Sequence, residues 1–381
     1  MIYLDQAASS YPKPESVVHA VSESLTEYAA NPGRGGHRLA KRAASVIRKT
    51  REELSDFFGL GIPENVWFYP NATAALNQAL KGFPLDEGDH VLTSSYEHNS
   101  VRRPLEFLKR TRGIEVSYVH PDEKEWAAAL TEKTKLMVAV HGSNLTGRIA
   151  PIEKMARLAG QAGIPILVDA SQTAGVLPID MEKMGIDMLA FPGHKGLLGP
   201  QGTGALLVRR GMDLEPVMHG GTGAHSAEPE QPNTYPERYE SGTLNTPGIA
   251  GLLAGLNEVK AIGLEQIFVH ESELARQCVQ GLKTINGVQV YGPDTDEKRL
   301  AVISFRIEGV DVQETAIILD QYYDMAVRAG LHCTPLAHES MGTADGGTVR
   351  VSFGPYNTKE EVGQFLQAIE EIKYGMSGQG T

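Results

Sequence analysis

The chain has 381 residues, of which 41% are hydrophobic, 22% charged and 7% aromatic, and this balance excludes a disordered or fibrous protein. Lys and Arg total 35 against 47 Asp and Glu, for a formal net charge of -12, which argues against a nucleic-acid-binding surface. Only 2 cysteines are present, so a disulfide scaffold and a four-cysteine zinc site are excluded.

The amino-terminal stretch, MIYLDQAASS, carries an acid at Asp5 and lacks the basic, apolar and small-residue order of a signal peptide. No apolar run approaches the roughly 18 to 20 residues that a membrane span needs. We therefore expect a cytoplasmic protein with neither a membrane nor a nucleic acid as partner.

Two helical patterns, 14–30 and 38–59, come first, and from about residue 65 short apolar runs alternate with longer amphipathic segments. The short runs are NVWFYP, HVLTSSYEH, KLMVAVHGSN, IPILVDASQ, DMLAFPG and GALLVRR. Buried strands separated by helices are typical of a mainly parallel sheet covered by helices. We predict an α/β fold with its ligands at the carboxyl ends of the strands.

A polar stretch rich in glycine and proline, 211–245, interrupts this alternation and is typical of a long functional loop. His219 and His225 lie in it without metal-ligand spacing, so we interpret them as polar loop residues and predict no metal site. A helical region to about residue 285 and a smaller α+β unit complete the chain. We expect only the GMSGQGT tail to be disordered.

The run VWFYP is followed by Asn71, Ala72 and Thr73. Asn71 can cap the next helix, and Thr73 lies in its first turn. A helix amino terminus offers free N–H groups that can bind a phosphate, but most Asn caps are only caps. This feature alone leaves a ligand role and a structural role both open.

Lys195 lies between two apolar runs and has apolar and glycine neighbours throughout. A lysine removed from water has a lowered pKa that suits Schiff-base chemistry. The glycines after it lead into a strand rather than opening a helix, so they are not a dinucleotide fingerprint.

Asp169 directly follows the run IPILV. Its buried charge requires a partner or an open site, although by itself it is equally explained as a hydrogen-bonded turn residue. Asp169 and Lys195, separated by one strand, fit pyridoxal 5'-phosphate (PLP), because an acid keeps its ring nitrogen protonated and a lysine holds its aldehyde.

These residues belong to a longer set of motifs by which the chain resembles the class V aminotransferases. These are fold-type I PLP enzymes, and the resemblance is to their branch of cysteine desulfurases, group II-like, and selenocysteine lyases. The motifs run in family order over nearly the whole chain: YLDQAASSYPKP, NPGRGGHRLA, SSYEHNSVRRP, HGSNLTG, VDASQTAG, GHKGLLGPQGTG, RYESGTLNTPGIAG, RAGLHC and RVSFGPYNTKEEV.

The resemblance implies two domains with the active site between them. The large PLP-binding domain, 15–258, is expected to contain a mainly parallel seven-stranded sheet. Residues 1–14 and 259–381 are expected to form a smaller α+β domain.

The resemblance also implies the roles of individual residues. Lys195 matches the Schiff-base lysine, Asp169 the partner of the pyridine nitrogen, and His98 the imidazole stacked on the ring. The other cofactor-binding matches are Ala72, Thr73 and His194 at the phosphate, Asn144 and Gln172 at the ring hydroxyl, and Thr243 at the phosphate of a neighbouring subunit, which implies a homodimer with shared sites. Arg350 matches the arginine that holds the substrate carboxylate, a task suited to a bidentate guanidinium, with Asn144 and Arg328 also at the substrate.

Two positions depart from the family pattern. Pro192 stands three residues before the lysine, where the family usually has Ser or Thr, and Asn71-Ala72-Thr73 replaces Gly-Thr-Thr. The phosphate site therefore lacks two hydroxyl groups, and we expect Asn71 or the glycine-rich loop to compensate.

Cys333 in RAGLHC falls where group II desulfurases carry the nucleophile that accepts sulfur. A thiol beside His332 and near an arginine can form the required thiolate, whereas without the resemblance a small buried residue at a strand end is the simpler interpretation. Cys278 lies among apolar helical positions and is expected in the core.

The resemblance thus implies a PLP-dependent cysteine desulfurase that converts L-cysteine to L-alanine, holds the sulfur on Cys333 as a persulfide, and passes it to an acceptor protein. A selenocysteine lyase, with selenocysteine as substrate, or another class V aminotransferase, lyase or epimerase remains the alternative. A cofactor-binding scaffold without turnover is disfavoured because Lys195, Asp169 and Arg350 are all present.

Overall fold

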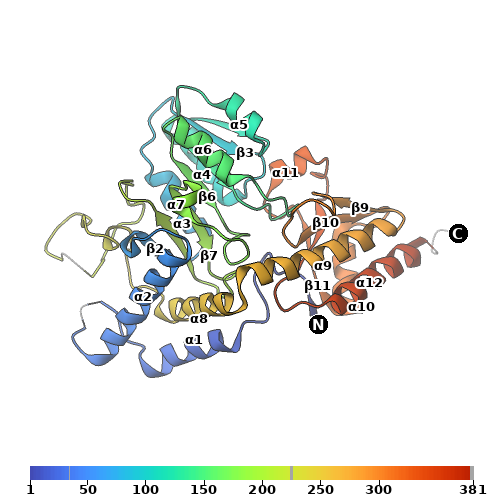
Figure 1. Cartoon of the computed structure of the whole chain (residues 1–381), viewed down its shortest axis with the longest axis horizontal. Helices are drawn as coiled ribbons and strands as arrows, with labels where there is room; N and C mark the ends of the chain where they lie inside the picture. The colour runs from blue at the N-terminus through green and yellow to red at the C-terminus, as the bar shows by residue number, and fades with distance from the viewer. Residues whose placement is uncertain (34, 224–225, 378–381) are drawn as a thin grey trace.

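The computed structural model describes residues 1–33, 35–223 and 226–377. Its larger part is built around a sheet, shown at its centre in Figure 1, that has seven strands. The strands, in spatial order, are β2 (Val66–Tyr69), β8 (Gly204–Val208), β7 (Met188–Pro192), β6 (Ile166–Asp169), β5 (Thr134–Val140), β3 (His90–Ser94) and β4 (Glu115–Val119). β8 runs antiparallel to its two neighbours, β2 and β7, and the other neighbouring pairs are parallel. The predicted mainly parallel, seven-stranded sheet is confirmed.

Both faces of the sheet are covered, which explains why its central strands are continuous apolar runs. In β6, Leu167 packs into the cluster formed with α3 and α4, while Ile166 and Val168 pack into the opposite cluster. The helices between the strands are α3 (Ala72–Gly82), α4 (Asn99–Arg112), α5 (Glu123–Ala129), α6 (Ile152–Gln161) and α7 (Met181–Met184).

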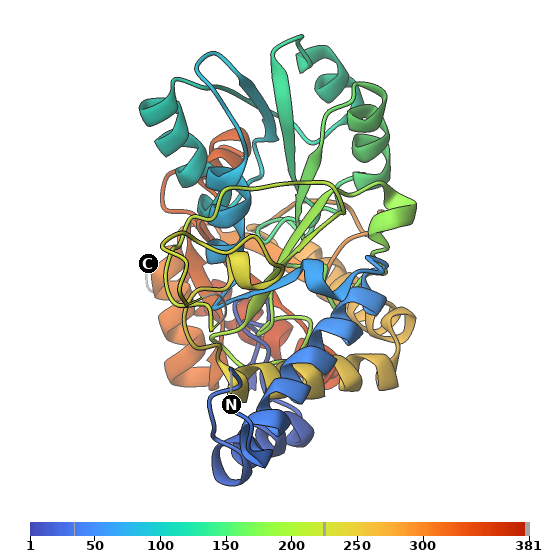
Figure 2. The ribbon, with the colours of Figure 1, turned by 90° about the vertical axis from the view of Figure 1, so that its left-hand side faces the viewer.

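Three further helices lie near the sheet: α1 (Glu15–Glu27), α2 (Arg38–Phe57) and α8 (Thr246–Ile262). α8 packs against both α1 and α2. Figure 2 shows α1 and α2, in blue, on one side of the twisted sheet. A short helix, η1 (Pro63–Asn65), leads into β2.

The described residues of the predicted loop, 211–223 and 226–245, are irregular except for the short helix η2 (Glu237–Tyr239), and they cross Figure 2 as a yellow-green coil. Its end is anchored at Tyr239, whose ring stacks on Trp67 with centroids 3.6 Å apart. The next residue, Glu240, pairs with Arg51 of α2 at 2.8 Å. His219 is exposed, and His225 lies outside the described residues.

The rest of the chain forms a smaller α+β unit, as predicted. Its elements are α9 (Leu264–Thr284), β9 (Val288–Tyr291), β10 (Val302–Ile307), α10 (Val312–Tyr323), β11 (Met325–Ala326), β12 (Arg328–Gly330), α11 (Pro335–Ser340), β13 (Thr348–Ser352) and α12 (Lys359–Ser377). Four strands form an antiparallel sheet in the order β12-β13-β10-β9. Cys278 is a residue of α9 and is buried in the core that this helix forms with the sheet, as expected.

The amino-terminal segment connects the two parts of the molecule. Strand β1 (Ile2–Tyr3) pairs in parallel with β11 of the smaller unit. A few residues later, the Ser10 N–H donates to the His194 carbonyl at 2.9 Å, beside the large sheet. The domain boundaries expected from the resemblance stay a prediction.

One boundary prediction was wrong. Helix α12 extends to Ser377, so the first part of the GMSGQGT tail continues an amphipathic helix, and only 378–381 lie outside the described residues. Among the described helices, none has both the length and the apolar character needed to cross a membrane.

Candidate active site

The carboxyl ends of β5, β6 and β7 and the amino terminus of α3 meet at a cavity of about 220 Å³. Strand ends and a helix terminus supply polar groups there without disturbing the sheet beneath them. Ten predicted site residues line the cavity: Ala72, Thr73, His98, Asn144, Asp169, Gln172, His194, Lys195, Arg328 and Arg350. Cys333 and Thr243 do not line it.

Lys195 projects from the turn that follows β7. Its amine has no hydrogen-bond or ion-pair partner within the described residues. Burial, with Arg350 and Arg328 acting in the same direction, lowers the pKa of this amine to about 8 against the opposing negative charge of Asp169. A large fraction of the amine is therefore neutral, and nucleophilic, at mildly alkaline pH.

Close backbone packing fixes the turn that carries Lys195. Gly175 has a left-handed backbone with φ of 86°, and a β-carbon there would lie 2.3 Å from the carbonyl oxygen of Gly196. Only glycine allows this approach.

Asp169 ends β6 and is 2% exposed. Its Oδ1 accepts a hydrogen bond from the Ser171 N–H at 2.9 Å and another from the Ser171 hydroxyl. These donors stabilise a carboxylate at the cavity wall. Sequence reasoning did not single out Ser171.

His98 caps α4, because its Nδ1 accepts the Ser100 N–H at 3.1 Å. Burial lowers the pKa of His98 to about 4, with the cations Lys195, Arg328 and Arg350 adding to the shift and Asp169 opposing it. An Nδ1 that accepts the cap hydrogen bond leaves Nε2 to carry the proton of the neutral ring.

Ser100 connects two predicted site residues. Its Oγ lies 2.8 Å from Nδ1 of His98 and 2.7 Å from Oγ1 of Thr73. Sequence reasoning missed this serine, although its position in the first turn of a helix after a strand end was a usable signal.

The amino terminus of α3 has the donors needed for a phosphate. Asn71 caps it, its Oδ1 accepting the Ala74 N–H at 2.9 Å, and helix geometry leaves the N–H groups of Ala72 and Thr73 without an intrahelical acceptor. Nearby, Nδ1 of His194 is buried with no partner in the described part of the chain. The cap uses only the Oδ1 of Asn71, so the expectation that Asn71 compensates for the missing hydroxyls, with its Nδ2 as the donor, stays a prediction.

The amide groups of Gln172 and Asn144 are oriented by the protein. Gln172 Nε2 donates to the Ala7 carbonyl at 3.0 Å, and Asn144 Nδ2 donates to the His332 carbonyl at 2.8 Å. Their amide oxygens are therefore the atoms left to accept from a ring hydroxyl.

Arg350 is 2% exposed and held on two sides. Its Nη1 donates to the Asn144 carbonyl at 2.9 Å, and its Nη2 donates to Oδ1 of Asp5 at 2.7 Å. Its strand partner Arg328 lies opposite it on β12. Asp5 was not predicted as a site residue, although an acid in the first motif was visible.

Cys333 is exposed, so the buried interpretation is wrong. It follows β12 and shares with His332 a left-handed backbone, with φ of 60° and 49°. The His332 ring is buried and its Nε2 lies 3.0 Å from the Thr348 carbonyl. Burial lowers the pKa of His332 to about 3, so this imidazole is a poor base for the Cys333 thiol, contrary to the expectation from the sequence.

Thr243 lies elsewhere on the surface. It is exposed, accepts a hydrogen bond from Asn31 at 3.4 Å, and lines a separate cavity of about 740 Å³ beside α2.

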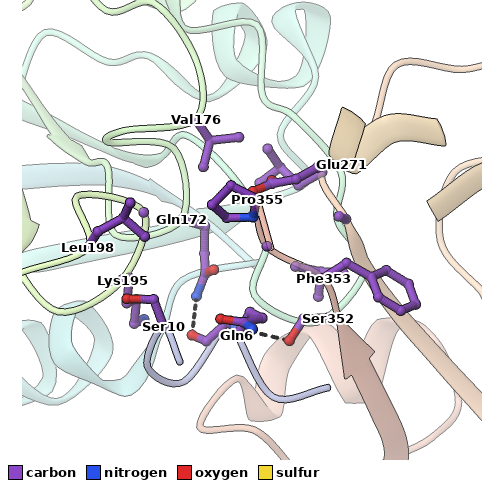
Figure 3. A pocket seen from close by; sticks show the side chains of 16 residues that line it. Gln6, Ser10, Gln172, Val176, Lys195, Leu198, Glu271, Ser352, Phe353 and Pro355 are labelled. Carbon is purple, nitrogen blue, oxygen red and sulfur yellow. Dashed lines mark hydrogen bonds between the residues drawn. The ribbon is translucent and has the colours of Figure 1, made fainter. Parts of the chain in front are cut away.

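A smaller cavity of about 40 Å³ lies on another side of Lys195 and Gln172. Figure 3 shows Glu271 of α9 reaching it from beside Pro355, across from Lys195. Burial raises the pKa of this acid to about 8.

Three comparisons with known proteins agree with one another. A family model described as aminotransferase class-V matches residues 2–365. A protein of Methanothermobacter thermautotrophicus named probable cysteine desulfurase is 35% identical over 97% of this chain and 94% of its own length. A protein of Haloferax volcanii named cysteine desulfurase is 32% identical over 98% and 89%.

Solved structures give the same result. The apo structure of the cysteine desulfurase from Thermococcus onnurineus matches with a TM-score of 0.92 and 34% identity, over 98% of this chain and 95% of that one. The cysteine desulfurase CsdA from Escherichia coli matches with a TM-score of 0.89 and 26% identity, over 98% and 94%.

Proposed function

Because the chain belongs to the class V aminotransferase family, whose members use PLP, and has the fold-type I architecture, we propose that it is a PLP-dependent cysteine desulfurase. Its substrate is L-cysteine. Its products are L-alanine and a sulfur atom that is held on Cys333 as a persulfide. The observation that carries this proposal is the meeting of Lys195, Asp169 and His98 in one cavity beside an open helix amino terminus.

The residues present fit PLP. The orphaned Nδ1 of His194 and the free N–H groups of α3 suit its phosphate, and Asp169 suits its ring nitrogen. Gln172 and Asn144 would offer oxygens to its hydroxyl, and the neutral His98 ring would pack against its face. When bound, PLP supplies an electron-poor ring that stabilises negative charge developing on the substrate α-carbon.

The protein's own groups perform the proton transfer. Lys195 takes the α-proton on Nζ, a role for which its lowered pKa is suited. Arg350 orients the substrate carboxylate with the guanidinium N–H groups that remain beside Asp5 and Asn144. Asp5 fixes the plane of that guanidinium through its 2.7 Å contact.

Cys333 accepts the sulfur. Its thiolate attacks the substrate sulfur, so that a sulfur–sulfur bond forms as the substrate carbon–sulfur bond breaks, and a proton returned to the carbon side completes alanine. The thiol lies outside the cavity lining, so the loop after β12 must bring it inward.

A homodimer, a sulfur-acceptor protein and a cytoplasmic location belong to the same proposal. The position of Thr243 beside a large cavity away from Lys195 supports a role toward a second subunit. An exposed, unpaired Cys333 supports a reducing compartment and access for an acceptor.

The test is to purify the protein, record the visible absorption of lysine-bound PLP, and assay alanine and sulfide from L-cysteine. We expect Cys333→Ala to keep the absorption and lose desulfuration by about 100-fold or more. A colourless protein that gains no visible band with added PLP contradicts the proposal, and unaltered desulfuration by the variant contradicts the role of Cys333.

A selenocysteine lyase is the second candidate, and the position of Cys333 outside the cavity lining favours it. Cleavage of selenocysteine by Cys333→Ala, with loss of cysteine desulfuration, would identify this reaction.

A further inference from the structure

Glu97 is a fully buried acid next to His98 for which the reaction above gives no role. Its side chain is 0% exposed. Its Oε1 accepts two hydrogen bonds, from the Ser94 hydroxyl at 2.6 Å and from the Val140 N–H at 2.8 Å. Its Oε2 is buried without a partner in the described part of the chain.

These contacts close a gap in the large sheet. The pairing of β3 with β5 ends at Thr93 and Val138, because β3 turns away toward α4. The next N–H of β5 that points toward β3 is that of Val140, and Glu97 Oε1 takes the place of the missing strand carbonyl. Without it, a buried donor would remain unpaired.

The gap lies directly beneath the candidate active site. On its other side, Val140 pairs with Asp169 across β5 and β6. Along the chain, Glu97 is followed by His98, the cap of α4. The Glu97 carboxyl group therefore connects the β5 backbone beside Asp169 with the turn that leads into His98.

The surroundings of Glu97 do not favour a charge. No cation pairs with it among the described residues, and a buried carboxylate without one is expensive. Burial, with the neighbouring charge of Asp169 acting in the same direction, raises the pKa of Glu97 to about 8 against the opposing hydrogen bonds from Ser94 and Val140. Tyr118 of β4 also interacts electrostatically with Glu97.

We propose that Glu97 is a positioning residue, held as an uncharged acid with its proton on Oε2, that helps to place His98 and Asp169, the residues assigned to the face and to the ring nitrogen of PLP. Its effect on the ring rests on the proposed function. The neutral state leaves Asp169 as the negative charge available to the ring nitrogen.

Glutamine is the matched substitute for a neutral glutamic acid, because its amide oxygen can accept from both Ser94 and Val140. We expect Glu97→Gln to bind PLP within about twofold of the wild type and to keep its visible band and pH profile. Glu97→Ala and the shorter Glu97→Asp should bind PLP about tenfold or more weakly, with a shifted visible circular dichroism, because Val140 loses its acceptor. Asp187→Asn alters a second buried acid, which accepts the Ile166 N–H at 2.8 Å at the amino end of β6, and should leave PLP affinity unchanged.

The charge state is measured on the apo protein, independently of any reaction. In infrared difference spectra recorded well below pH 8, Glu97→Gln should remove a protonated carboxylic acid band. Loss of a carboxylate band instead, or PLP affinity equal in Glu97→Ala and Glu97→Gln, overturns the proposal. Weakening by Asp187→Asn as large as that by Glu97→Ala overturns it as well. If the wild type itself takes up no PLP, the proposed function and the positioning role fail together, while the infrared result still decides the charge of Glu97.

Discussion

At the scale of single residues, burial of the charged Lys195 amine lowers the stability of the folded apo protein. Folding removes this amine from water and places it in a cavity that two arginines also line, and its pKa falls from 10.5 to about 8. Such a shift means that the folded protein binds a proton there less readily than the unfolded chain does.

We therefore expect Lys195→Met to stabilise the apo protein below pH 8, by up to about 3 kcal/mol. The folded pKa is the lower one, so wild-type stability rises with pH between about 8 and 10.5, and the advantage of the variant should shrink over that window. Urea unfolding of both apo proteins across this range measures the effect.

Lys49→Met, at an exposed position of α2, is the control and should show no such trend. A difference between Lys195→Met and wild type that stays constant from pH 7 to about 10 would mean that the amine is not destabilised by burial.

At the scale of elements, the site depends on close contacts between turns. Gly175 and Gly163 both have a left-handed backbone, with φ of 86° and 69°, but only at Gly175 would a β-carbon meet another backbone segment. That segment is Gly196, next to Lys195.

Gly163→Ala should cost about 1 to 2 kcal/mol of stability from backbone strain alone and keep normal PLP uptake. Gly175→Ala carries the same strain and must also displace Gly196, so PLP affinity should fall by about tenfold or more. PLP titration and chemical unfolding of the two variants separate the effects. Equal PLP affinity in both would show that the Lys195 turn tolerates the shift.

The strands and the site residues differ in how well the sequence predicts them. The central strands were predictable because both faces are buried, whereas β4 was missed, since all of it is at least partly exposed at the sheet edge. Asp169 and Lys195 were found because charged residues are unexpected beside apolar runs. Ser100, Ser171 and Glu97 were not singled out, because their roles depend on hydrogen bonds that only the folded chain creates.

The same limit applies to His332. Its position beside Cys333 suggested a base, but the backbone directs its ring toward Thr348 of β13. Adjacency in sequence says little about direction where two consecutive residues adopt a left-handed backbone.

At the scale of the whole molecule, the proposed dimer predicts complementation between two defective chains. If Thr243 serves the partner's cofactor, a mixed dimer of Lys195→Ala and Thr243→Ala subunits contains one site with both residues intact. Differentially tagged, purified mixed dimers should recover about half of the wild-type activity.

Mixed dimers of Lys195→Ala with the Lys195→Ala/Thr243→Ala double variant are the control, because they contain no lysine in either site. Activity no higher than that of the Thr243→Ala parent in the first mixture would argue against shared sites.

The ion pair between Asp5 and Arg350 joins residues 345 positions apart in the chain. Closing so long a loop costs entropy and delays folding, because the two distant residues must come together before their ion pair can stabilise the chain. Strand β1 cannot pair until β11 has formed, and the Ser10 contact behind Lys195 depends on the same segment. The substrate arginine and the cofactor lysine are therefore both completed late in folding, so that uptake of PLP reports that the chain has folded along its whole length.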